Sequence, residues 1–94
     1  MSALAPFVVP PDVGWTCTVD EGGAPRVFVA PLPSGPVDVL PDESAIIWLA
    51  AVEGTGPVVD EVARTTGNPP EVIREDVEAF VDELLARGFL ARPG

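Results

Sequence analysis

The chain has 94 residues, with 15 acidic and 5 basic side chains, no His, one Cys and a net charge of −10. This length suits one domain, and a hydrophobic content of 47% is enough for a core. The negative charge argues against nucleic acid and anionic membranes as partners. No stretch is long enough to span a membrane, and a lone Cys forms no internal disulfide, so we expect a cytoplasmic protein.

The first 12 residues are interrupted by prolines and lack the basic start of a signal peptide. We expect residues 1–12 to form a flexible arm and residues 13–91 to form a single domain.

Three short strands are predicted in the first half of the chain, at residues 15–19, 26–30 and 37–40. They are rich in β-formers, and "DEGGAP" and "PLPSG" between them are turn sequences. Such short connections predict hairpins and therefore an antiparallel sheet. We expect Cys17, in the first strand, to be a small buried hydrophobic residue.

Three helices are predicted in the second half, at residues 42–52, 57–66 and 69–87. In the last of them one face is acidic and the opposite face is apolar, with Ile73, Val77, Phe80, Val81 and Leu84 at helical spacing. Gly88 is expected to end this helix, with Phe89 folding back on Leu84. Trp48 and Phe80 are expected in the core or at the margin of a groove. The expected N-caps are Asp42, Thr55 and Asn68.

Three strands followed by three helices predict an α+β domain, similar to a winged helix-turn-helix. The sequence offers no recognisable set of catalytic residues. Cys17 has no His to activate it, and neither zinc ligands nor a phosphate-binding loop is present. The sequence therefore favours a binding module over an enzyme, with no cofactor.

The order of motifs over residues 13–91 resembles the PqqD-like peptide chaperones, also called RiPP recognition elements. Pro41 stands where that family commonly has Asn, and Val37 or Asp38 replaces an aromatic residue early in the strand. The matching residues are Val39-Leu40, Ser44-Ala45, Ile47-Trp48, Glu53-Gly54-Thr55, Asp76-Val77, Phe80, Leu84 and Gly88-Phe89-Leu90.

This resemblance implies binding of the leader segment of a ribosomally made precursor peptide. The leader would add as a strand to the third strand and lie against the third helix, and the domain would present it to a modifying enzyme or a leader peptidase. The expected site is the backbone of Val37, Asp38, Val39 and Leu40, together with one flank of the last helix, Arg74, Glu78, Val81 and Leu85.

Arg74 is expected to meet an acidic leader side chain, and the alternative is a solvated pair with Glu78 four residues on. Two other functions stay open: a non-catalytic subunit of a heteromeric complex, and a winged-helix DNA-binding regulator. The acidic last helix argues against the regulator. The chain is expected to be a monomer or a dimer formed through its edge strand.

Overall fold

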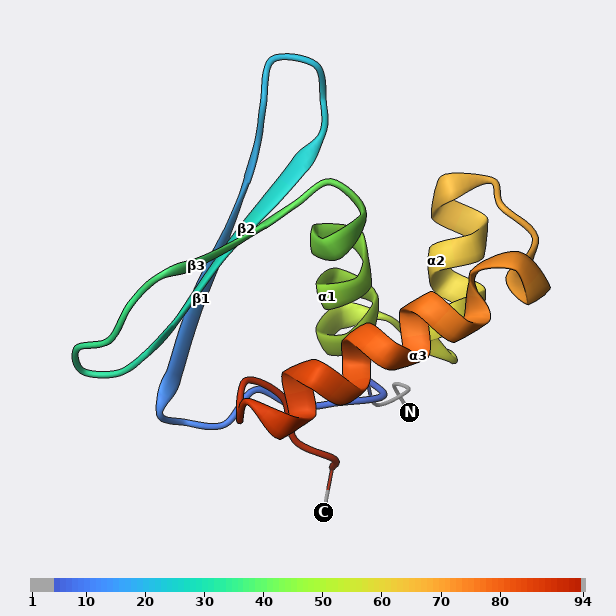
Figure 1. Cartoon of the computed structure of the whole chain (residues 1–94). Helices are drawn as coiled ribbons and strands as arrows, with labels where there is room; N and C mark the ends of the chain where they lie inside the picture. The colour runs from blue at the N-terminus through green and yellow to red at the C-terminus, as the bar shows by residue number, and fades with distance from the viewer. Residues whose placement is uncertain (1–4, 94) are drawn as a thin grey trace.

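The computed structural model describes residues 5–93 and has three strands followed by three helices. The sheet lies on one side of the molecule and the helices on the other (Figure 1). This confirms the predicted α+β fold, while the likeness to a winged helix remains a prediction. No helix in residues 5–93 is long and apolar enough to cross a membrane. The elements are β1 (Val13–Val19), β2 (Pro25–Pro31), β3 (Asp38–Pro41), α1 (Glu43–Glu53), α2 (Val58–Thr66) and α3 (Pro70–Ala86).

The sheet is antiparallel, in the order β1-β2-β3, so β2 is central and β1 and β3 are its edges. Much of the β1–β2 hairpin extends beyond the helices, as Figure 1 shows. Cys17 of β1 is exposed, so the prediction that it is buried was wrong. Cys17 pairs with the buried Val27 and so lies on the helical side of the sheet, but its exposure shows that the helical layer does not cover β1 at this position.

Helix α1 is the centre of the core. It packs on β2, β3 and both other helices, and its Trp48 is completely buried, with an edge-to-face contact to Trp15 at 5.8 Å between ring centroids. The sheet contributes Val27 and Val29, and α3 contributes its apolar face. Of that predicted face, Phe80 is half-buried and the others are buried.

Of the three expected N-caps, Asp42 occupies the predicted position, whereas Thr55 and Asn68 do not. Asp42 occupies the N-cap position of α1, but its side chain makes no capping hydrogen bond. The N-cap of α2 is Pro57 and not Thr55. Pro69 is the N-cap of α3, while the side chain of Asn68 donates to the hydroxyl of Thr66. Proline fixes the backbone at both later helix starts, so a polar cap is not needed to direct the chain.

The end of α3 follows the prediction. Gly88 has φ +80°, and the N–H of Phe89 donates to the carbonyl of Leu84 at 3.0 Å. Phe89 is buried against the core. This left-handed glycine ending turns the chain back beneath α3.

Part of the expected flexible arm is docked on the helical layer. The N–H of Phe7 donates to the carbonyl of Ala51 in α1, and Val8 forms an antiparallel bridge with Ala91. Residues 1–4 of the arm lie outside the described residues.

Candidate functional site

Strand β3 presents an uncovered sheet edge. It pairs with β2 on one side only, and in the described part of the chain α3 packs on α1 and α2 but not on β3. An unpaired edge offers main-chain donors and acceptors to another strand. The strand is four residues long, and such shortness discourages pairing between copies of the protein.

The register decides which peptide groups face outward. The N–H of Asp42 donates to the carbonyl of Pro25, which continues the β2–β3 register as a hydrogen-bonded pair. Because hydrogen-bonded pairs alternate along an antiparallel ladder, Leu40 and Asp38 also bond to β2, and the N–H and C=O of Val39 face away from it. Pro41 shares the outward side but has no N–H. Val39 is therefore the outward amide donor within β3.

The side chains of β3 alternate across the sheet. Leu40 is buried on the helical side, opposite Val27, and Asp38 shares that side, opposite Val29. Val39 faces the other side of the sheet and is 49% exposed. A strand added to this edge would place alternate side chains beside Asp38 and Leu40, on the helical side.

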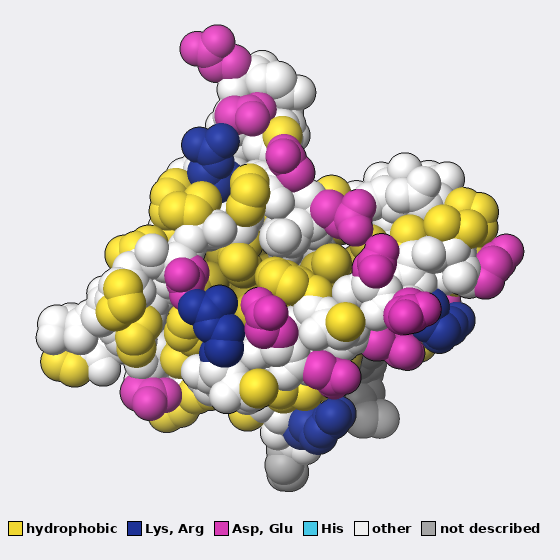
Figure 2. Space-filling model, viewed as in Figure 1, with side chains coloured by type: hydrophobic (Ala, Val, Ile, Leu, Met, Phe, Trp, Pro, Cys, Tyr) yellow, Lys and Arg dark blue, Asp and Glu magenta, His cyan; other side chains and the backbone are white. Residues whose placement is uncertain are grey.

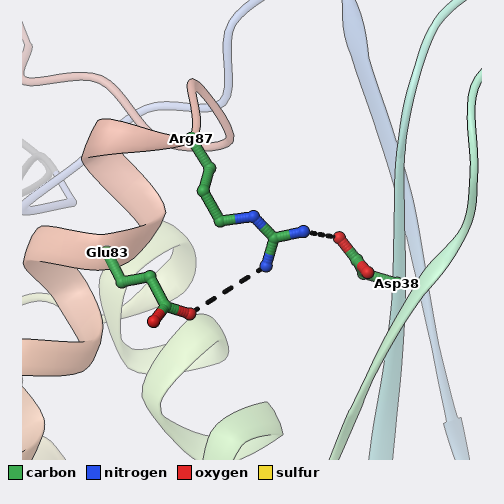
Figure 3. Close-up of polar contacts among 3 residues, drawn as sticks. All are labelled: Asp38, Glu83 and Arg87. Carbon is green, nitrogen blue, oxygen red and sulfur yellow. Dashed lines mark hydrogen bonds and ion pairs between the residues drawn. The ribbon is translucent and has the colours of Figure 1, made fainter.

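An ion pair links β3 to the end of α3. The guanidinium of Arg87 bonds to the carboxylate of Asp38, and its second terminal nitrogen lies 4.0 Å from Glu83 (Figure 3). The same guanidinium stacks on Phe89, 4.6 Å from the ring centroid. We call Asp38, Glu83 and Arg87 the bridge triad. All three are at least one-third exposed.

The surface around the bridge triad combines apolar and charged groups. Figure 2 shows hydrophobic side chains gathered between the sheet and α3, with acidic and basic side chains bordering them. Such a surface can hold an extended peptide through apolar contacts and select its charges at the border.

The predicted groove wall on α3 does not lie on the flank of the helix that carries Glu83 and Arg87. Arg74, Glu78 and Val81 line a cavity of about 430 Å³ together with Phe7 and Arg92, next to the N-terminal segment. Their flank and the Phe80–Glu83–Arg87 flank lie on opposite sides of the buried stripe of α3. The two halves of the predicted site, β3 and the Arg74 flank, are therefore not brought together.

The details of that flank agree with the alternative for Arg74. Its guanidinium lies 3.9 Å from the carboxylate of Glu78, and both side chains are more than half exposed. Leu85, the last residue of the predicted set, is half-buried and packs against the core.

Glu83 and Arg87 were not selected from the sequence as candidate residues beside β3. Their spacing of four residues indicates a shared flank with Phe80, and the signal is as strong as the one for Arg74 and Glu78. Periodicity defines both flanks of α3 equally well. Which of them faces β3 depends on how α3 crosses α1, and no local pattern specifies that.

Comparison with known proteins gives one family. Residues 41–90, slightly more than half of the chain, match the model of the family described as "Coenzyme PQQ synthesis protein D (PqqD)". The match begins at the last residue of β3 and covers all three helices. No curated protein and no solved structure matches the chain.

Proposed function

The chain belongs to the PqqD family, and from that premise we propose that it binds the leader segment of a precursor peptide as an added strand on β3. Membership supports a general role as a peptide-binding chaperone in the biosynthesis of ribosomally made, post-translationally modified peptides. Members of the family are non-catalytic accessory proteins that work with modifying enzymes.

The uncovered edge of β3 is the observation that carries this proposal. The outward N–H and C=O of Val39 give a bound strand its main-chain partners. The helical side of the edge supplies side-chain contacts at Leu40 and the bridge triad, since alternate residues of the added strand turn that way. This assigns the wall of the groove to Glu83 and Arg87 in place of the Arg74 flank.

The peptide is then presented to a modifying enzyme or a leader peptidase. Strand addition suits this task because it holds a few residues of the leader in extended form and leaves the rest of the precursor free.

The test is a titration of the protein into a fluorescently labelled leader, taken from the precursor-peptide gene nearest its own and followed by anisotropy. Val39→Pro removes the outward N–H but none of the bonds to β2, so we expect roughly tenfold weaker binding. Val39→Ala keeps the N–H and is the matched control, with affinity expected near that of the unmodified protein.

Circular dichroism and thermal unfolding must show that both variants are folded. A folded Val39→Pro variant that binds the leader as tightly as Val39→Ala would rule out strand addition at this edge.

A further inference from the structure

The bridge triad contains two carboxylates and one cation. Arg87 bonds to Asp38 and approaches Glu83 at 4.0 Å, so a single guanidinium serves both acids. The local charge is therefore negative, within a chain whose net charge is −10.

A strand added to β3 meets this triad directly. Adjacent strands lie about 4.8 Å apart, and the added residue beside Asp38 turns its side chain to the helical side. There it enters the space between the carboxylate of Asp38 and the end of α3, where the guanidinium of Arg87 now lies (Figure 3). The charge of the peptide side chain beside Asp38 therefore determines how the negative charge of the bridge triad is balanced.

We infer that the peptide carries a Lys or Arg at the position beside Asp38, and that this cation replaces Arg87 as the partner of Asp38. This inference rests on the proposed function and names the side chain that the same site selects.

Charge pairing gives the reason for this preference. With a cation in place, Asp38 pairs with the peptide and Arg87 pairs with Glu83, four residues before it on the same helix. Arg87 also keeps its stacking contact with Phe89. An acidic side chain would instead put three carboxylates around one guanidinium, and like charges directly across a strand pair are unfavourable. The preference is the reverse of the acidic one expected from Arg74.

A displayed library of random 12-residue peptides tests the inference without a known leader. The protein is immobilised, and the selected peptides are aligned on the position that shows the strongest charge preference. We expect enrichment of Lys and Arg at one position, with Lys→Glu there weakening binding roughly two- to fivefold.

Variants show whether the triad is the cause. Asp38→Asn is expected to abolish the preference for a cation among the peptides that it selects. Glu75→Gln removes one negative charge from an exposed position outside the triad, so it is the matched control and should keep the preference.

The outcomes separate the inference from the proposed function. Peptides that need the N–H of Val39 but show no charge preference, or prefer Asp and Glu, overturn the inference and leave strand addition intact. Selection of no peptide, or of peptides that bind Val39→Pro equally well, overturns both.

Discussion

Asp42 explains how a strand leads into a helix with almost no loop. Its φ of 51° and ψ of −119° lie in a region that glycine adopts much more readily than other residues. In this conformation its N–H completes the ladder to Pro25, and its C=O accepts from the N–H of Ile46 in the first turn of α1. One residue thus ends β3 and begins α1, which fixes the edge strand against the helical layer.

Asp42→Gly is expected to stabilise the protein by about 1 kcal/mol, because relief of the backbone strain exceeds the entropic cost of glycine. Urea unfolding measures the change. Asp42→Ala is the control, since it keeps the Cβ atom and should give no gain. A destabilised Asp42→Gly would mean that the carboxylate contributes more than its backbone costs.

At the scale of the elements, the ends of α3 are controlled by the backbone. Pro69 and Pro70 set its start, and Gly88 sets its end. A Cβ atom at position 88 would have no neighbouring atom within 4 Å, so a larger side chain would not clash there. The positive φ alone requires it.

Gly88→Ala should therefore destabilise the protein by about 1 kcal/mol through strain alone. Thermal unfolding is a suitable measurement. Gly56→Ala is the matched control, because Gly56 has no positive φ and a Cβ atom added there would lie at an ordinary 3.8 Å from the side chain of Glu61. Equal effects of the two substitutions would contradict a special role for the left-handed ending.

The elements also show what the sequence could predict. Alternation in β3, the period of α3 and Gly88 are local signals, and each predicted its structure correctly. The exposure of Cys17 and the contact between Arg87 and Asp38 depend on where helices lie over the sheet. These are properties of packing between elements, so the edge strand β3 was predictable and its ion pair with the end of α3 was not.

In the whole molecule, residues 7 and 8 link α1 to the segment that follows α3. Phe7 packs against the core and bonds to Ala51 of α1, while Val8 bridges Ala91 after α3. Arg92 also lies over the ring of Phe7, 5.7 Å from its centroid. These contacts lie on the helical layer, away from the edge of β3 at which the peptide is proposed to bind.

Phe7→Ala is expected to lower the free energy of unfolding by about 1–2 kcal/mol, as for loss of a half-buried aromatic side chain. Val8→Ala is the control, because Val8 is 44% exposed and its backbone bridge survives the change. Urea unfolding compares the two. If both variants match the unmodified protein, the arm is as loose as its sequence predicts.

Under the proposed strand addition, the short edge of β3 would also limit how long a peptide stays bound. One outward amide in the strand and a few side-chain contacts suit a dissociation constant of about 1 μM, and not the nanomolar affinity of a permanent partner. At an association rate of about 10⁶ M⁻¹ s⁻¹, such a complex dissociates about once per second. That is within a factor of about ten of a typical enzymatic turnover. In that case a longer edge would retain the peptide past the point at which an enzyme needs to release its product, and the brevity of this strand would make transfer of the substrate rapid and repeatable.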